Sequence, residues 1–258
     1  MEATYIALGA VVLAAITLAS QMRGKSLSIR EHEEFAKNAK ERMNELKAEY
    51  VQHVGTDLTV VNAARIAHNR ESEELVEKDK LLIKYLAKHK HFTPFEHNTL
   101  TVIVHCPLYI RSQIHRHRTF SYNEVSRRYS ADDIDFYIPP IEDLLIQSTM
   151  NKQGGDSALE SELARKFNGD LRGWLLQGEY SYREWISKGV AKEIARAFLS
   201  VPLMTKFYMT GNLRNWNQFL ILRLDAHAQK EVRVIAEQIE GIISNLWPVA
   251  YQALKENS

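Results

Sequence analysis

The chain has 258 residues, of which 45% are hydrophobic and 25% are charged, a composition typical of a globular protein with one large or two small domains and not of a disordered chain. The formal net charge of +1 gives no long-range attraction to nucleic acid, so no nucleic-acid partner is expected. The single cysteine, Cys106, excludes an intramolecular disulfide and fits a reducing compartment.

Residues 3–22 form a run of twenty uncharged and mostly apolar residues. As a helix, this run would span about 30 Å, which is enough to cross a bilayer. Positive charges follow it at Arg23, Lys25 and Arg30, so the positive-inside tendency places the remainder of the chain in the cytoplasm. We therefore predict that residues 1–27 are a hydrophobic N-terminal segment, which anchors the protein to a membrane through residues 3–22. A buried N-terminal helix and an upstream extension that is not used in the cell are the alternatives.

The next segment has the pattern of an amphipathic helix. Ser28 and Glu31 match a capping box, and apolar residues recur after it at helical spacing. We predict a helix over residues 28–47 and assign residues 28–48 as a helical spacer that precedes the main domain, residues 49–258. The apolar stripe of this helix consists of Phe35, Ala39, Met43, Leu46 and Tyr50.

The main domain mixes helical and strand patterns. Its first half predicts a helix capped by Asp57 that ends at Ile66, a helix over residues 75–86, a strand over residues 99–105, a helix from Pro107 to Ile114 and a strand over residues 136–138. Its second half predicts a loop at Gly154-Gly155, helices over residues 158–188 interrupted near Asn168-Gly169, a C-cap at Lys188-Gly189, a helix over residues 191–199, a strand over residues 205–210, and helices over residues 212–224 and 231–247. This order predicts an α+β fold in which helices flank a small mixed or antiparallel sheet, with a helical N-terminal extension.

Residues 116–129 carry the densest polar motif of the chain, Arg-His-Arg-Thr-Phe-Ser-Tyr-Asn-Glu-Val-Ser-Arg-Arg-Tyr. Its guanidinium and imidazole groups supply N–H donors suited to phosphates and planar heterocycles. Ser121, Asn123 and Ser126 are unfavourable inside helices, so we predict an ordered loop that follows a helix and binds an anionic ligand.

This motif resembles the signature of the flavin-dependent thymidylate synthases. The matching positions are Arg116, His117 and Arg118, Ser126 after seven intervening residues, and Asn123, Glu124, Arg128 and Tyr129 in register. Three further segments resemble the family in the expected order: residues 89–97, 212–214 and 222–229. The resemblance extends from about Glu49 to the C-terminus and implies the fold of that family over the predicted catalytic domain, residues 49–258.

The resemblance implies a reaction, in which dUMP is methylated to dTMP with FAD, NADPH and methylenetetrahydrofolate. It also implies a homotetramer with active sites shared between subunits. The residues that it places in the dUMP site are Gln113, Arg116, Glu124, Ser126, Arg127, Arg128, Arg196 and Arg223. Those that it places at the flavin are His91, Thr93, Arg116, His117, Arg118, Glu124, Asn212, Arg214 and Gln218.

Arg223 is the residue to which we assign substrate activation. A guanidinium beside the uracil N3 would favour the deprotonated, electron-rich ring, whose C5 can attack a one-carbon fragment without a covalent bond to the enzyme. The structural alternative is a cation that interacts with the dipole at a helix C-terminus. Cys106 follows an apolar strand-like run and is expected to be a small buried residue and not a nucleophile.

Several features leave individual assignments open. The chain has no G-x-G-x-x-G, which argues against a Rossmann-type cofactor fold. Thr93 and Glu96, with Pro94 between them, also fit a helix cap. Ala67 and Gln218 depart from the residues usual in the family at those two positions, and Ala67 removes one expected polar contact.

Two other functions compete with this interpretation. A metal-dependent enzyme would use the histidines between residues 89 and 117, although their spacing matches no standard metal motif, and no metal site is predicted. A membrane-tethered module that binds phosphate or nucleic acid would use the arginine cluster and the N-terminal anchor.

Overall fold

The computed structural model describes residues 45–130, 134–150 and 152–257, which form two compact units. The sheet unit comprises residues 46–106, 110–125 and 205–257, and the helix unit comprises residues 107–109 and the described part of 126–204. The predicted catalytic domain therefore consists of two units that interleave along the chain.

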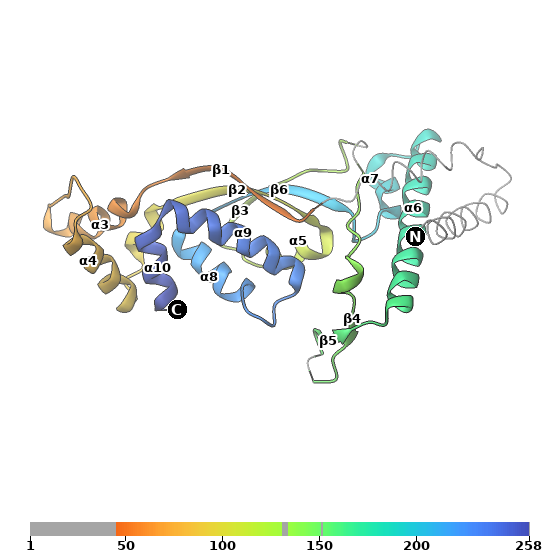
Figure 1. The fold of residues 1–258 in the computed structure, drawn as a ribbon. Helices are drawn as coiled ribbons and strands as arrows, with labels where there is room; N and C mark the ends of the chain where they lie inside the picture. Colours follow the sequence, from red (N-terminus) through yellow and green to blue (C-terminus); the bar gives the residue numbers. More distant parts are fainter. Residues whose placement is uncertain (1–44, 131–133, 151, 258) are drawn as a thin grey trace. The chain divides into compact units, whose positions relative to one another are not determined.

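A four-stranded sheet organises the sheet unit, with strand order β1-β2-β6-β3 (Figure 1). Its strands are β1 (Lys47–Val54), β2 (Thr99–Pro107), β3 (Ser121–Glu124) and β6 (Met204–Asn212). The β1–β2 and β3–β6 pairs are antiparallel, and a register shift interrupts β1 between Tyr50 and Gln52. Thr101 contacts Thr210 and Leu108 contacts Leu203, so β2 and β6 also run antiparallel. The α+β prediction with a small antiparallel sheet is confirmed.

One face of the sheet forms the core of this unit. Alternate residues of β2 and β6, among them Val102, Val104 and Met209, are fully buried because side chains alternate between the two faces of a strand. Three helices cover this face in Figure 1, namely α8 (Leu213–Arg223), α9 (Lys230–Leu246) and α10 (Pro248–Glu256). Trp216 on α8 and the nearby Trp247 are fully buried, and they supply much of the apolar area whose removal from water stabilises the unit.

The remaining helices of the sheet unit come before β2 in the chain, apart from one that follows it directly. They are α3 (Asp57–Arg65), η1 (Ile66–His68), α4 (Glu77–Lys88), η2 (Thr93–His97) and α5 (Leu108–Ile114). A buried ion pair between Arg65 and Asp79 joins α3 to α4, and α4 packs against α10. Arg65 also donates to the Ser72 hydroxyl, which fixes the segment between the two helices.

Asp57 joins the start of α3 to the start of α10. Its carboxylate accepts hydrogen bonds from the backbone N–H groups of Val249 (3.1 Å) and Ala250 (2.8 Å), in the first turn of α10. These N–H groups have no partner within their own helix, so a carboxylate there satisfies them and complements the helix dipole. Burial raises the pKa of Asp57, and the two N–H donors oppose that shift.

The helix unit is built around one long helix, α6 (Ser161–Ser187). Its other elements are η3 (Ile141–Asp143), the hairpin of β4 (Leu145–Gln147) and β5 (Gly155–Ala158), α7 (Lys192–Ala195) and η4 (Arg196–Phe198). Its core contains Ile134, Phe136, Leu175, Tyr182, Ala195 and Leu203.

Several predicted elements are confirmed with small changes of boundary. The strands over residues 99–105 and 205–210 are the central strands β2 and β6, and the helix over residues 231–247 is α9. Gly189 has a φ of 88°, the left-handed conformation expected of a glycine after a helix C-cap.

Other local predictions are wrong. Residues 136–138 form no strand, and only Phe136 makes an isolated bridge, to Leu203. Thr56, and not Asp57, is the N-cap of α3. The predicted ordered loop after α5 contains strand β3, and α10 was not expected. Helix α6 continues through Asn168 and Gly169, because a long helix packed along its length absorbs the roughly 1 kcal/mol cost of one glycine.

The N-terminal predictions fall mostly outside the described residues. The end of the predicted spacer is described, and there Lys47 and Ala48 belong to strand β1 and not to a helix, as does Tyr50 of the predicted apolar stripe. Residues 28–44 of the spacer and the membrane anchor at residues 3–22 stay predictions. Within the described parts of the chain, no helix is long and apolar enough to cross a membrane.

The capping role of Asp57 predicts a measurable loss of stability. We expect Asp57→Ala to lower the free energy of unfolding by about 1–3 kcal/mol, because the buried N–H of Ala250 and the partly buried N–H of Val249 lose their acceptor. Asp57→Asn, which keeps an acceptor oxygen, should lose less. Urea unfolding measures both, with Asp170→Ala, at an exposed surface ion pair, as the control that stays close to wild type. Equal losses in Asp57→Ala and Asp170→Ala would contradict the cap.

Candidate active site

The Arg-His-Arg motif lies in the turn between α5 and β3, and two side chains fix the backbone of this turn. The Tyr122 hydroxyl lies 3.1 Å from the carbonyl of Ile114 and 2.9 Å from that of His117, both of which are acceptors. Asn215 on α8 donates to the carbonyl of Thr119 at 3.0 Å. Because its backbone is held from both sides, the turn presents its side chains in defined positions.

A glycine allows this turn to approach the sheet. A Cβ added to Gly211 on β6 would lie 2.4 Å from the ring of Phe120, which is buried against Trp216. A larger residue at position 211 would therefore displace Phe120 and the turn that carries it.

Three predicted site residues meet at the end of this turn, and we call Gln113, His117 and Arg223 the Arg223 cluster. Arg223 Nε donates to His117 Nε2 at 3.0 Å, and Arg223 Nη2 donates to the carbonyl of Gln113 at 3.1 Å. The Gln113 side chain in turn donates to Gln229 at 2.5 Å. The helix-dipole alternative for Arg223 is thus not its main contact, since its donors point to residues of α5 and the turn after it.

The Arg223 cluster sets the charge of His117. Burial, and then the neighbouring charge of Arg223, lower the pKa of His117 to about 4, so the imidazole is neutral at physiological pH. Its Nε2 accepts from Arg223, which assigns the proton of the neutral ring to Nδ1. Burial and the charge of Arg116 also lower the pKa of Arg223, but a guanidinium stays protonated in proteins.

The cations of the sheet unit divide into two kinds. Arg214 pairs with Glu96 at 2.5 Å, and Arg111 pairs with Glu124 at 3.0 Å. By contrast, no carboxylate of the described residues pairs with the side chains of Arg116, Arg118 or Arg223. These three guanidinium groups therefore make this region electropositive and suit an anionic ligand.

Hydrogen bonds hold one of the two carboxylate oxygens of Glu124. Its Oε1 accepts from Arg111 Nε at 3.0 Å and from the Thr205 hydroxyl at 2.8 Å. Arg111 and Thr205 were not predicted as site residues. Neither stands in the motif, and only the folded arrangement of α5, β3 and β6 brings them to Glu124.

The predicted flavin residues of η2 and α8 have different roles. Asn212 is the N-cap of α8 and accepts from the backbone N–H of Asn215 at 3.0 Å. Arg214 lies over the Phe92 ring at 5.2 Å in addition to its ion pair with Glu96. The alternative in which Glu96 caps a helix at Thr93 is wrong, because η2 has Phe92 at its N-cap with no side-chain cap bond.

The other predicted flavin residues of this unit, His91, Thr93 and Gln218, are exposed. Ala67, one of the two departures from the family pattern, is exposed in η1. Their positions leave these side chains accessible to a ligand, and the His91 ring also lies edge-on to the Tyr85 ring, with the ring centroids 6.1 Å apart.

Four predicted nucleotide residues belong to the helix unit. The Ser126 hydroxyl accepts from the backbone N–H of Arg128, whose guanidinium lies 5.5 Å from the Tyr129 ring centroid. Arg127 is partly buried, and Arg196 is exposed and donates to the carbonyl of Glu193. A hydrogen bond from Lys192 to the carbonyl of Tyr129 joins this turn to α7.

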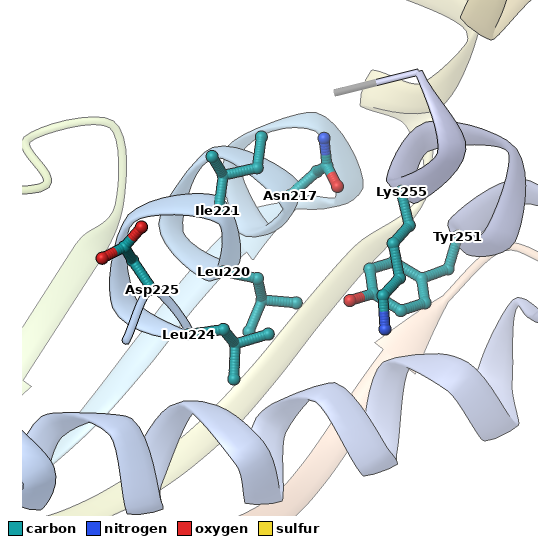
Figure 2. A pocket seen from close by; sticks show the side chains of 7 residues that line it. All are labelled: Asn217, Leu220, Ile221, Leu224, Asp225, Tyr251 and Lys255. Carbon is teal, nitrogen blue, oxygen red and sulfur yellow. The ribbon is translucent and has the colours of Figure 1, made fainter. Parts of the chain in front are cut away.

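Two cavities of the sheet unit lie outside the predicted site. One, of about 260 Å³, lies between α8 and α10 and is shown in Figure 2. Its apolar part is lined by Leu220, Leu224 and the Tyr251 ring, and Asp225 and Lys255 lie at its ends. The other, of about 460 Å³, lies beside α3 and η2. Neither cavity is lined by a residue that the motif predicts, and the candidate site is therefore described by its charged side chains.

Two other kinds of reactive site, a cysteine nucleophile and a metal centre, were considered at sequence level and have no counterpart among the described residues. Cys106 is fully buried at the end of β2, and burial raises the pKa of its thiol, so no thiolate is available there. Over residues 45–130, 134–150 and 152–257, no group of three or more His, Cys, Asp or Glu side chains is placed to hold a metal ion.

A family model described as thymidylate synthase complementing protein matches residues 49–249. The chain is 38% identical over 206 residues to the flavin-dependent thymidylate synthase of Wolbachia pipientis wMel, covering 80% of this chain and 72% of that protein. It is 37% identical over 205 residues to the protein of the same name from Thermotoga neapolitana, covering 80% of this chain and 88% of that protein.

Two solved structures are also similar to this chain. The UMP/dUMP methylase PolB from Streptomyces cacaoi, bound with 5-Br dUMP, superposes with a TM-score of 0.75 at 32% identity, covering 83% of this chain and 96% of that chain. The same protein bound with 5-Br UMP gives a TM-score of 0.75 at 31% identity, covering 83% and 95%.

The Arg223–His117 contact makes a prediction about proton binding. We expect His117 to titrate near pH 4 and to carry its neutral-state proton on Nδ1, as measured by nitrogen NMR. Unfolded histidine titrates near 6.5, so the unfolded chain takes up this proton first on acidification. The contribution of His117 to stability should therefore fall as pH decreases from about 6.5 to about 4.

Arg223→Met is the matched variant for this measurement. It removes the smaller cause of the shift, so the pKa of His117 should rise toward, but not reach, the unfolded value because burial remains. His117→Gln should remove the corresponding part of the dependence of stability on pH. A wild-type His117 that titrates near 6.5 with its proton on Nε2 would contradict the contact.

Proposed function

The chain belongs to the flavin-dependent thymidylate synthase family, and from this premise we propose that it methylates dUMP to dTMP with FAD as cofactor and methylenetetrahydrofolate and NADPH as co-substrates. It is an enzyme, a flavin-dependent methyltransferase of thymidylate synthesis. The family match over residues 49–249 carries this conclusion, and it favours this function over a metal-dependent enzyme and over a phosphate- or nucleic-acid-binding module.

The residues present fit a flavin dinucleotide. The guanidinium groups of Arg116 and Arg118, which no carboxylate of the described residues pairs with, suit a diphosphate. The exposed amide of Gln218 and imidazole of His91 suit the polar edge of a flat ring system. Glu124 and His117 belong to the same set, together with Thr93, Asn212 and Arg214. When bound, the flavin supplies the reducing electrons of the methylation.

Arg223 is the proposed activating residue. Its guanidinium is held by a neutral imidazole and a backbone carbonyl, so its positive charge is not cancelled by a carboxylate within the described residues. Such a charge beside a uracil stabilises the electron-rich ring and so promotes attack by C5. Because this activation needs no covalent bond, the buried Cys106 thiol has no part in it.

We assign the phosphate of dUMP to arginine side chains. Arg127, Arg128 and Arg196 of the helix unit, with the Ser126 hydroxyl, form one set of donors, and Gln113 and Arg116 of the sheet unit form another. In a homotetramer with shared active sites, one subunit would supply the first set and a neighbour the second. Titration of mixed subunits that carry Arg196→Ala or Arg116→Ala tests this sharing, because a mixture would recover activity only if the sites are shared.

The function is tested with the purified wild-type protein. We expect it to be yellow, to show flavin absorption, and to form dTMP from dUMP when methylenetetrahydrofolate and NADPH are present. Expression in a thymidine-requiring bacterium should restore growth without thymidine. A colourless protein that takes up no flavin and does not complement the strain would overturn the proposal. UMP belongs in the same assay, since the similar PolB is a UMP/dUMP methylase.

Arg223 and Cys106 form a matched pair of variants for the chemical step. We expect Arg223→Ala to bind flavin but to release no tritium from the C5 position of labelled dUMP, because the ring is no longer activated. Cys106→Ala should release tritium at a rate within about twofold of wild type, since the thiol is buried and not ionised. Full release by Arg223→Ala, or loss of release in Cys106→Ala despite a folded protein, would contradict these roles.

A further inference from the structure

Glu124, Arg111 and Thr205 form a polar cluster, the Glu124 anchor, that connects three elements of the sheet unit. Arg111 comes from α5, Glu124 is the last residue of β3, and Thr205 lies near the start of β6. Both donors reach the same oxygen, Oε1, at 3.0 Å from Arg111 Nε and 2.8 Å from the Thr205 hydroxyl. Among the described residues, no donor contacts the second oxygen, Oε2.

The two contacts fix the direction of the carboxylate. A glutamate side chain has three rotatable bonds, and ordering it costs rotamer entropy that its own contacts must offset. Thr205 is only 6% exposed, so its hydroxyl has little access to water and depends on Glu124 as acceptor. Arg111 balances the charge of the carboxylate. With Oε1 occupied twice, the glutamate is held in one orientation, and within the described residues Oε2 remains available as an acceptor.

Because Oε2 is a carboxylate oxygen, it can bind a ligand group that donates a hydrogen bond. A carboxylate repels phosphate, so Oε2 suits a neutral O–H donor, and the nucleotide carries such a donor on its ribose. The phosphate then lies at the arginine side chains to which we assign it. The anchor would thus orient the nucleotide as well as bind it.

We propose that Arg111 and Thr205 are positioning residues that hold Glu124 so that its Oε2 accepts a hydrogen bond from the ribose hydroxyl of the nucleotide. This inference rests on the proposed function and on the resemblance that places Glu124 at the nucleotide as well as at the flavin. It differs from a purely structural role, in which the cluster only ties α5, β3 and β6 together. A partly exposed ion pair such as Arg111–Glu124 stabilises a fold by little.

Thr205 offers the sharper test, because its side chain has close isosteres. Thr205→Val keeps the volume and removes the donor, whereas Thr205→Ser keeps the donor. We expect Thr205→Val to raise the Kd for dUMP about tenfold and Thr205→Ser to stay within about twofold of wild type, as measured by calorimetry on the flavin-loaded protein. Arg111→Met should raise the Kd in the same direction, and this partly exposed site keeps the test open if Thr205→Val does not fold.

Thr101 supplies the matched control. It is 6% exposed like Thr205, lies in the same sheet, and its hydroxyl bonds with a neighbouring side chain, but that neighbour is Thr210 and not Glu124. Thr101→Val should lose as much thermal stability as Thr205→Val while its Kd for dUMP stays at the wild-type value. Equal dUMP affinity in the two variants would overturn the positioning role.

A double-mutant cycle with Glu124→Gln shows whether Thr205 acts through Glu124. If it does, Thr205→Val should raise the Kd by less than about twofold once Glu124 is already replaced. Losses that multiply would mean that Thr205 acts elsewhere, and they would overturn the proposal. A wild-type protein that binds no dUMP would overturn the proposed function and the positioning together, whereas normal binding by wild type and Thr205→Val would overturn the positioning alone.

Discussion

The hydrogen bond from Arg223 to His117 is the contact on which the candidate site depends. An arginine in a folded protein is most simply held by a carboxylate, but such a partner would also cancel its charge. Here a neutral imidazole and a backbone carbonyl hold the guanidinium, so its orientation is fixed while its charge remains available. The low pKa of His117 follows from the same arrangement, since burial and the adjacent cation both disfavour a second positive charge.

This contact exists only because the fold fixes the backbone on either side of it. His117 lies in a turn whose carbonyls are held by Tyr122 from β3 and by Asn215 from α8, and Arg223 lies at the other end of that same helix. The small residue Gly211 lets the turn pack directly against the sheet. The site therefore depends on the packing of α8 as strongly as on the residues of the motif.

The sequence motif names candidate residues of this site but not the residues that hold them. Arg116, His117 and Glu124 stand in the motif and stay predictions as ligand contacts. Arg111, Thr205 and Tyr122 have no such signature, since they become neighbours only when β3 pairs with β6 and α5 packs beside them. Strand β3 was not predicted for a similar reason. Its four residues are polar and have no alternation of polar and apolar side chains, and they form a strand because they pair with β6.

The same limit applies to the arginines, which are alike in the sequence but not in the fold. Arg111 and Arg214 each form an ion pair with a glutamate from a different element, which no local sequence pattern could reveal. By contrast, no carboxylate of the described residues pairs with Arg116, Arg118 or Arg223. Desolvating unpaired cations next to one another costs free energy, as the lowered pKa of Arg223 beside Arg116 shows. A fold that keeps this repulsion is arranged for an anion that arrives from outside. The net charge of the protein is only +1, so it is this local imbalance, and not the total charge, that suits the region to an anionic ligand such as the nucleotide that we propose.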